Sequence, residues 1–399
     1  MTDIAERLEE LRERGLRRRL RLVQSPQGPR VLLDGNDVLL LCSNDYLGLA
    51  SHPRVRAAAA EAAMGWGAGA GGSRLISGNM PPHRELELRL AAFKRYPSAL
   101  LFGSGYLANT GTIAALAGRG EVVLSDELNH ASIVDGCRLS RAETFVYRHR
   151  DLEHLAWGLR EARGRAALIV TDGVFSMDGD LAPLAELAEL ARRHRCRLMV
   201  DEAHATGTLG PSGRGSVAAT GLSKQVDVVV GTLGKALGSY GAYVCASAEL
   251  TEYLLNAARS FVFSTAPPPS AVAAALAAVE LLEAHPERVE RVGANAATLR
   301  NALIGQGLSV GSSETQIVPV AVGDAELTMS LSERLLEHGV FAQGIRPPTV
   351  PKGTSRLRFS VTAAHRRVEL ERAAELAGAA ARELGIVAAL GAVPQQLAA

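Results

Sequence analysis

Helical and strand-like segments alternate along this chain from residue 38 onward, and this alternation limits the possible folds more than any other feature of the sequence. The clearest predicted strands cover residues 99–102, 121–124, 167–171, 197–200 and 226–230, and each ends in polar or glycine-rich residues. Such a pattern is typical of an α/β fold, in which a mostly parallel sheet carries helices on both faces. Ligands bind beyond the carboxyl ends of the strands in such sheets, so we expect the functional residues in the loops there.

The pattern changes near residue 286, where a long helix rich in Arg and Ala begins. Two strands near residues 316–322 and 356–361 and a last helix follow it, which indicates a smaller α+β domain. We therefore expect an N-terminal arm and helix (1–44), a large domain (45–285), a small C-terminal α+β domain (286–386) and a flexible tail (387–399). A chain of 399 residues is long enough for such a division, because single cores stop growing below this size.

The charge balance makes some classes of partner improbable. Lys and Arg number 43 against 42 Asp and Glu, so no strong field indicates nucleic acid or an anionic membrane, and a small-molecule substrate is favoured. Gly, Ser, Asn and Pro interrupt the uncharged stretches, unlike a membrane-spanning helix. The N-terminal residues mix acids with arginines, which fits neither a signal peptide nor a transit peptide. The four cysteines form no Cys-x-x-Cys pair, so we expect a cytoplasmic protein with no metal site and no disulfide framework.

Four residues that follow two of the predicted strands indicate a particular chemistry. Asp201 and His204 come after strand 197–200, while Thr232 and a glycine-flanked Lys235 come after strand 226–230. Pyridoxal phosphate (PLP) enzymes need a lysine for a Schiff base, an acid that keeps the pyridine nitrogen protonated and donors for the phosphate. Each of these residues taken singly is more often a helix cap or a solvated side chain. Their ordered combination is much more specific, and it predicts that Lys235 is the Schiff-base lysine.

A second motif follows strand 99–102 and admits two interpretations. Residues 103–108 (Gly-Ser-Gly-Tyr-Leu-Ala) precede a predicted helix, whose free N–H groups could hold a phosphate dianion. The same residues match the dinucleotide fingerprint, with Asp126 about twenty residues further on, which would indicate an NAD-dependent dehydrogenase. We rank that alternative second because it leaves Asp201, His204 and Lys235 without a role. A non-enzymatic scaffold ranks third.

Two further residues follow predicted strands in the same way. His130 comes after strand 121–124 and could place its ring against a flat cofactor, although a capping or partly exposed histidine is an equally ordinary explanation. Ser176 comes after strand 167–171, where a turn-forming serine is the simpler explanation.

At these residues the chain resembles the α-oxoamine synthase family, fold-type I PLP enzymes that condense an amino acid with an acyl-CoA thioester. The resemblance extends from about residue 18 to about residue 385. The motifs that carry it are, in chain order, Ser43-Asn44-Asp45-Tyr46-Leu47-Gly48-Leu49, Gly71-Gly72-Ser73-Arg74, Asn129-His130-Ala131-Ser132, Gly173-Val174-Phe175-Ser176-Met177-Asp178-Gly179-Asp180, Asp201-Glu202-Ala203-His204 and Thr232-Leu233-Gly234-Lys235.

Within the family, residues 345–351 (Ile-Arg-Pro-Pro-Thr-Val-Pro) are more similar to the biotin-pathway branch than to the branches that use glycine. This resemblance implies L-alanine and a pimeloyl thioester as substrates, with either coenzyme A or acyl carrier protein as the carrier. The alternative is a sister branch that uses glycine and a short acyl-CoA.

The resemblance also implies a role for each motif residue. Lys235 would form the Schiff base, Asp201 would pair with the pyridine nitrogen, and His204 would bond the ring hydroxyl. His130 would stack on the ring and polarise the acyl oxygen of the substrate. The other cofactor contacts implied are Gly105, Tyr106, Ser176 and Thr232.

The implied substrate contacts lie further apart in the sequence. Asn44 and Arg358 would hold the amino-acid carboxylate, to which a guanidinium fork is suited. Thr349 and an arginine of the arm would meet the acyl substrate; the spacing selects Arg18 from the run 17–19, where a solvated helix face is the ordinary alternative.

The resemblance further implies a homodimer with shared active sites. Ser264 and Thr265, just before the prolines 267–269, would reach the cofactor phosphate of the neighbouring subunit. An ordinary strand-to-helix turn is the alternative, because Ser, Thr and Pro are common in such turns.

Overall fold

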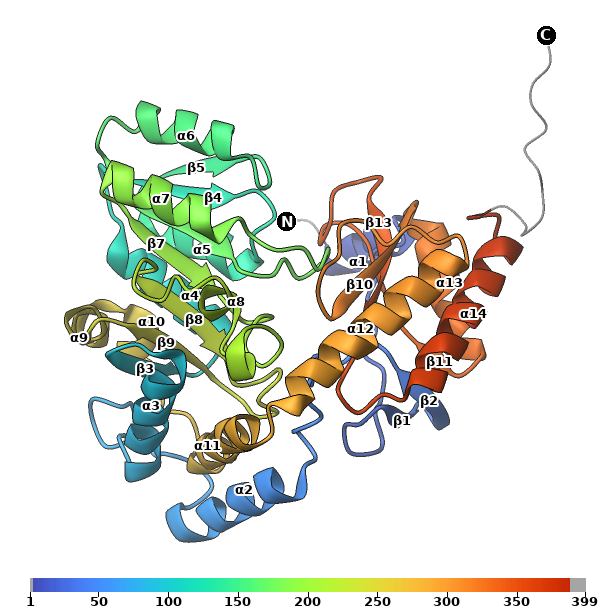
Figure 1. Cartoon of the computed structure of the whole chain (residues 1–399), viewed down its shortest axis with the longest axis horizontal. Coiled ribbons are helices and arrows are strands. Elements are labelled where there is room, and N and C mark those ends of the chain that lie inside the picture. The colour runs from blue at the N-terminus through green and yellow to red at the C-terminus, as the bar shows by residue number, and fades with distance from the viewer. Residues whose placement is uncertain (1–2, 388–399) are drawn as a thin grey trace. The chain divides into compact units, whose positions relative to one another are not determined.

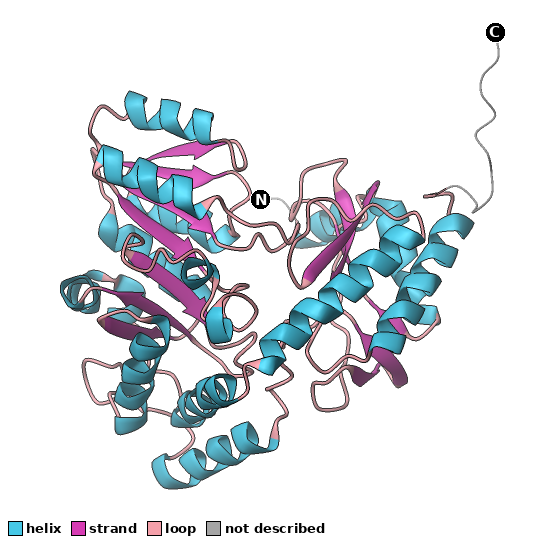
Figure 2. Cartoon of the chain, in the orientation of Figure 1, coloured by secondary structure: helices cyan, strands magenta, loops and turns pink. Residues whose placement is uncertain are grey.

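The computed structural model describes residues 3–387, and the chain divides into two compact units. The larger unit comprises Asn44–Ser176 and Asp180–Gly293, and the smaller unit comprises the remaining residues. Figure 1 labels the elements and Figure 2 separates helices from strands. Apart from Val387, the predicted tail lies outside the described residues.

A seven-stranded sheet in the order β3-β9-β8-β7-β6-β4-β5 forms the centre of the larger unit. The pairs β4–β5, β4–β6, β6–β7 and β7–β8 are parallel, and β9 is antiparallel to both β3 and β8. The predicted mostly parallel sheet is therefore confirmed. Its strands are β3 (Ser98–Phe102), β4 (Val122–Asp126), β5 (Glu143–Tyr147), β6 (Ala166–Asp172), β7 (Arg197–Asp201), β8 (Val228–Thr232) and β9 (Ala242–Ala246).

Helices cover both faces of this sheet, which explains why its inner strands are apolar along almost their whole length. Figure 1 shows α6 and α7 in front of the sheet and α4 and α5 behind it. Leu168 and Val170 of β6 pack in one buried cluster with Ile113 of α4 and Ile133 of α5. The helices of this unit are α2 (Pro53–Trp66), α3 (Pro81–Lys94), α4 (Gly105–Leu116), α5 (Ala131–Ser140), α6 (Leu152–Glu161), α7 (Leu184–His194), α8 (Ser216–Ala219), α9 (Ala248–Ala257), α10 (Arg259–Val262) and α11 (Pro269–Ala284), with the short 3₁₀ turn η1 (Pro211–Gly213).

The smaller unit combines the N-terminal arm with the C-terminal part of the chain. Its two three-stranded sheets have the orders β1-β2-β11 and β10-β13-β12, and Leu39 of β2 pairs with Val340 of β11. A single buried cluster joins residues of β2, β10, β13 and the helices around them. The elements are α1 (Ile4–Glu13), β1 (Arg30–Leu33), β2 (Asn36–Leu40), β10 (Ile317–Gly323), α13 (Ala325–Glu337), β11 (Val340–Phe341), β12 (Gln343–Ile345), β13 (Ser355–Ser360) and α14 (Arg367–Glu383).

Helix α12 (Glu287–Gly305) begins in the larger unit and ends in the smaller one. Within residues 3–387, no helix has both the length and the apolar character that a membrane crossing requires. The same residues contain no group of three or more His, Cys, Asp or Glu side chains arranged to hold a metal ion.

Candidate active site

The candidate site is built on the carboxyl ends of four neighbouring parallel strands. The last residues of β4, β6, β7 and β8 are Asp126, Asp172, Asp201 and Thr232. Asp172 pairs in register with Asp201, so two acids lie side by side at the strand ends. Parallel strands present their carboxyl ends at a single edge of the sheet, where ligands bind.

Lys235 lies in the turn after β8, and its side chain reaches the turn after β7. Its Nζ atom is 2.8 Å from Nε2 of His204. Nδ1 of His204 is 2.6 Å from the hydroxyl of Tyr46, which donates to Oδ1 of Asn44 at 3.0 Å. One proton assignment satisfies all three contacts: His204 carries its proton on Nδ1, and Nε2 accepts from the lysine. Tyr46 stood in the motif 43–49 without an assigned role, and the structure shows that it connects the predicted residues His204 and Asn44.

Asp201 is buried, and both of its carboxylate oxygens accept hydrogen bonds. Oδ1 accepts from the N–H of Ala203 at 2.8 Å, and Oδ2 accepts from Nδ2 of Asn109 at 2.6 Å. The same Asn109 amide donates to Oγ of Ser132 at 2.8 Å. Asn109 was not among the predicted site residues, and Ser132 stood in the motif 129–132 without an assigned role. A polar Asn in the uncharged predicted helix after residue 104 was the available signal.

His130 is the N-cap residue of helix α5, and its side chain connects to the same set of contacts. Its Nδ1 atom is 2.7 Å from Oγ of Ser132, and its N–H donates to Oδ2 of Asp172 at 2.8 Å. Desolvation lowers the pKa of His130; Asp201 acts in the opposite direction and Lys235 in the same one. Burial, together with the neighbouring Asp201, raises the pKa of Asp172. At neutral pH the His130 ring is therefore uncharged and can act as a hydrogen-bonding or stacking group.

The predicted phosphate cradle coincides with the start of helix α4. Ser104 caps this helix by accepting from the N–H of Leu107 at 3.2 Å, and Gly105 and Tyr106 form its first turn. The Tyr106 hydroxyl bonds to Asp135 on helix α5. Thr232 accepts from the N–H of Gly234 at 3.2 Å and so closes the turn that carries Lys235. Free N–H groups at a helix start suit a phosphate group.

Ser176, Ser264 and Thr265 lie in two other loops of the larger unit. Ser176 follows the buried Phe175 in the loop after β6. Ser264 and Thr265 follow α10, and their backbone contacts are with Phe261 and Ser73. Within this single chain, these backbone contacts of Ser264 and Thr265 are therefore with residues outside the turn that carries Lys235.

Three of the predicted substrate residues belong to the smaller unit. Arg358 is buried on β13 and donates to Oγ of Ser360 at 2.9 Å. Arg18 and Thr349 line one cavity of about 880 Å³, together with Arg17 and Arg346. Arg346 also donates to the backbone carbonyl of Arg17 at 3.0 Å, which ties the arm to this loop. Arg18 and Thr349, both predicted to contact the acyl substrate, thus line the same cavity.

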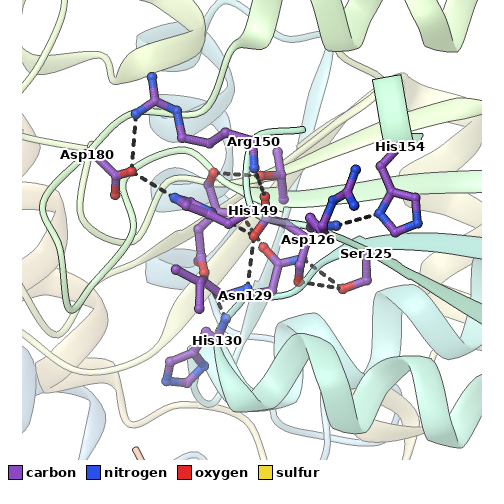
Figure 3. A network of polar contacts seen from close by, with 12 residues as sticks. Ser125, Asp126, Asn129, His130, His149, Arg150, His154 and Asp180 are labelled. Atoms are coloured by element: carbon purple, nitrogen blue, oxygen red, sulfur yellow. Dashed lines mark hydrogen bonds and ion pairs between the residues drawn. The ribbon is translucent and has the colours of Figure 1, made fainter. Parts of the chain in front are cut away.

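Asp126, the acid on which the dinucleotide alternative depends, is bound by other residues of the chain. Its Oδ1 atom lies 2.9 Å from Nδ1 of His149, and its Oδ2 atom accepts from the N–H of Arg150 at 3.0 Å (Figure 3). Oδ1 also accepts from the N–H of Leu128 at 2.9 Å. These contacts occupy the carboxylate that a ribose would need.

Residues 36–376 match the model of the aminotransferase class I and II family. The chain belongs to this family. The 8-amino-7-oxononanoate synthase of Geobacter sulfurreducens is 54% identical over 387 residues, which cover 96% of this chain and 99% of the relative. The enzyme of the same name from Citrifermentans bemidjiense is 52% identical over 390 residues, covering 97% and 100%.

Solved structures agree with this assignment. A serine palmitoyltransferase from S. paucimobilis with a bound PLP–myriocin aldimine has a TM-score of 0.91 and 35% identity, covering 96% of this chain and 98% of that one. An 8-amino-7-oxononanoate synthase from Francisella tularensis has a TM-score of 0.76 and 29% identity, covering 87% and 98%. The resemblance to the α-oxoamine synthases and the fold-type I prediction are both confirmed.

Proposed function

We propose that the chain is a PLP-dependent acyltransferase that joins L-alanine to a pimeloyl thioester. The products are 8-amino-7-oxononanoate, carbon dioxide and the free thiol carrier, which places the reaction in biotin biosynthesis. Relatives that carry this enzyme name match nearly the full chain at 52% and 54% identity. The observation that carries the proposal is the contact of 2.8 Å between Lys235 and His204, beside a buried Asp201.

The chemistry of the described residues fits PLP. Lys235 supplies an amine, Asp201 a buried carboxylate and helix α4 free N–H groups. Oδ1 of buried Asn109 has no hydrogen-bond partner within residues 3–387, so the amide that holds Asp201 keeps an acceptor available. When bound, PLP supplies an electron sink for the charge left as the amino acid loses a proton.

Several residues of the chain would each perform one function in this reaction. His204 orients the Lys235 amine, which would hold the cofactor covalently and, once released, act as the base. Asp201 would hold the proton of the pyridine nitrogen, and Asn109 and Ala203 fix the orientation of its carboxylate. His130 would polarise the acyl oxygen.

The acyl substrate would use the cavity of the smaller unit. A pimeloyl chain ends in a carboxylate, and guanidinium groups such as that of Arg18 are suited to carboxylates. Thr349, on the same cavity wall, adds a hydroxyl. Asn44 and Arg358 would hold the carboxylate of alanine.

The lysines of the chain make the central test simple, because they are Lys94, Lys224, Lys235 and Lys352. The purified protein should be yellow, and borohydride reduction followed by peptide mapping should place the label on Lys235. Lys235→Ala should abolish the covalent label, while Lys224→Arg and Lys352→Arg should keep it. A label on another lysine would overturn the assignment.

A substrate panel tests the acyl transfer itself. Thiol release should be fastest with L-alanine and pimeloyl thioester, on coenzyme A or on acyl carrier protein. Glycine with acetyl- or succinyl-CoA is the comparison. A preference for glycine and a short acyl group would move the chain to a sister branch.

We also propose a cytoplasmic homodimer in which Ser264 and Thr265 serve the partner's site. Mixing a Ser264→Ala, Thr265→Ala chain with a Lys235→Ala chain would then give heterodimers with one site that has all its components. Recovered thiol release that neither parent shows supports this arrangement, provided that the double mutant alone is severely impaired. Verified heterodimers without recovery, or an active monomer, would contradict it.

A further inference from the structure

His149, just after strand β5, is a largely buried histidine to which the proposed reaction gives no role. Figure 3 shows its ring between two carboxylates. Nδ1 is 2.9 Å from Oδ1 of Asp126, and Nε2 is 2.8 Å from Oδ2 of Asp180. Ionised carboxylates only accept hydrogen bonds, so both ring nitrogens must carry protons to make these two contacts. The geometry is that of an imidazolium cation.

Each carboxylate belongs to a segment that presents a residue of the candidate site. Asp126 opens the turn 126–130, in which it accepts from the N–H groups of Leu128 and Asn129, and this turn ends at His130. Asp180 closes the loop after β6, where its carbonyl accepts from the N–H of Phe175 at 3.0 Å, next to Ser176.

Two further contacts fix the histidine in this position. The Phe175 ring meets the His149 ring edge-on, with centroids 4.4 Å apart and an interplanar angle of 88°. Arg150 donates from its backbone to Asp126 at 3.0 Å and from its guanidinium to Asp180 at 3.3 Å. His149 and Arg150 thus form two parallel links between the same two acids.

The charges that face His149 favour its protonated form. Burial opposes protonation, but the hydrogen bonds to Asp126 and Asp180 outweigh it and raise the pKa of His149 to about 9. The groups around the bridge are the two acids, the guanidinium of Arg150, and Asp172 and Tyr147 near Asp126. The two acids therefore face two cationic side chains.

We propose that the His149 imidazolium is a positioning residue: it bridges Asp126 and Asp180 and so holds the His130 turn and the Ser176 loop in fixed places. Loss of the ring proton at alkaline pH breaks one of the two contacts and loosens both segments. The importance of these two segments for catalysis rests on the proposed function. The bridge itself does not, so it is tested in protein without added cofactor.

The first measurement is an NMR titration of protein labelled with ¹⁵N in the histidine rings. His149 should carry protons on both nitrogens at pH 7.5 and titrate near pH 9, and its signals are identified by their loss in His149→Gln. His154 is the matched control, because it stacks on Trp157 and its Nδ1 accepts from a backbone N–H. Titration of His149 at or below the ordinary histidine range would overturn the proposal.

The second measurement is amide hydrogen exchange. At pH 7.5, His149→Gln should exchange at least about tenfold faster than wild type in segments 126–130 and 173–180, and His154→Gln should match wild type. Above pH 9, after correction for the intrinsic pH dependence of amide exchange, wild type should show the same faster exchange in these two segments. Unchanged exchange in His149→Gln would refute the positioning role.

If His149→Gln fails to fold, Asp180→Asn supplies an independent variant. Removing one acid should lower the pH at which His149 titrates and at which segments 126–130 and 173–180 loosen. The alkaline limb of kcat should move to lower pH by the same amount in the holoenzyme. If His149 titrates at the same pH in Asp180→Asn as in wild type, the bridge is contradicted. If the titration moves to lower pH but the alkaline limb of kcat does not, the role of the bridge in the site is contradicted. Failure of the lysine labelling would leave the NMR and hydrogen-exchange measurements unaffected.

Discussion

Replacing Lys94 by Met should destabilise the larger unit far more than replacing Lys94 and Glu202 together. Lys94 ends helix α3, and Glu202 follows β7 between Asp201 and the His204 turn. Both side chains are almost fully buried. The lysine ammonium meets three acceptors: the Glu202 carboxylate, the Arg214 carbonyl and, at 3.2 Å, the Thr206 hydroxyl.

The magnitude follows from what each replacement leaves behind. Burial alone would lower the pKa of Lys94, but Glu202 outweighs this effect and raises it, so the buried lysine is charged. In Lys94→Met, Glu202 would keep the donors Ser216 Oγ at 2.9 Å and Val217 N at 2.7 Å but lose its cation. Removing one partner of a buried ion pair costs about 3–5 kcal/mol.

The double replacement, Lys94→Met with Glu202→Gln, leaves no buried charge. The Gln carbonyl can still accept from Ser216 and Val217, and the Thr206 hydroxyl keeps its contact of 3.0 Å with Tyr243. The remaining cost is about that of one unpaired polar group, roughly 1–2 kcal/mol. The double-mutant cycle should therefore give a coupling free energy of at least about 2 kcal/mol.

Urea unfolding followed by tryptophan fluorescence is the assay, because Trp66 and Trp157 both lie in the larger unit. Both single variants, the double variant and wild type are compared at constant pH and ionic strength. A cost of less than about 1 kcal/mol for Lys94→Met, or a double variant as unstable as Lys94→Met, would contradict the predicted penalty for an unpaired buried charge.

Three further predictions concern the candidate site and the smaller unit. Asp201→Asn should keep its circular dichroism spectrum yet lose at least about a hundredfold in thiol release, because a neutral amide no longer holds the ring proton; activity within a fewfold of wild type would contradict that role. His365, which accepts from one backbone N–H and donates to one carbonyl, has a pKa lowered by burial to about 4. The stability that neutral His365 contributes is present above the unfolded pKa of about 6.5 and is lost as pH falls toward 4. Between pH 7 and 4.5, the free energy of unfolding measured in urea titrations should therefore fall by up to about 3 kcal/mol more for wild type than for His365→Asn. Equal losses would contradict the prediction. Gly238→Ala should weaken cofactor binding far more than Gly234→Ala in absorbance titrations. Gly238 has a φ of +60°, and an added Cβ would lie 2.4 Å from the Ala50 nitrogen, whereas a Cβ added at Gly234 would make only ordinary van der Waals contacts. Equal effects of the two substitutions would contradict this prediction.

The sequence predicted the sheet well because its inner strands are buried on both faces. Each gives a short apolar run that ends in polar residues, and β6 and β7 begin or end within a residue or two of the predicted bounds. Strand β8 continues through Gly231 to Thr232, past the apolar run at 226–230, because backbone pairing does not stop where hydrophobicity does. The antiparallel direction of β9 follows from its pairing with β3 and β8, which no local pattern contains.

The N-terminal arm illustrates the same limit over a longer range. Leu39 pairs with Val340, and Leu40 with Phe341, although more than half of the chain lies between them. An isolated short strand at residues 38–41 could be read from the sequence. Its partner could not, because strand partners are set by tertiary packing and not by the periodicity of either strand.

The candidate site was predictable where residues follow strands in fixed order, as Asp201, His204 and Lys235 do. The residues that orient them were not predictable in this way. Tyr46 and Asn109 come from segments far away in the chain and act only through the fold, since their contacts with His204 and Asp201 are tertiary. Spacing can reveal the groups that react, but it seldom reveals the groups that hold them.

The three acids at neighbouring strand ends raise an electrostatic question, because like charges in a buried row repel each other. The charge of Asp126 is balanced by the His149 imidazolium that we propose, and its Oδ2 atom also accepts from the neutral backbone N–H of Arg150. Asp172 relieves the repulsion through a raised pKa that favours its protonated form. The hydrogen-bond donors of Asp201 that the structure shows, the Ala203 N–H and the Asn109 amide, are both neutral. In our proposal its counter-charge is the protonated pyridine nitrogen. Binding of the cofactor would then complete the neutralisation of this edge, so we expect a ring without a basic nitrogen to bind far more weakly than PLP.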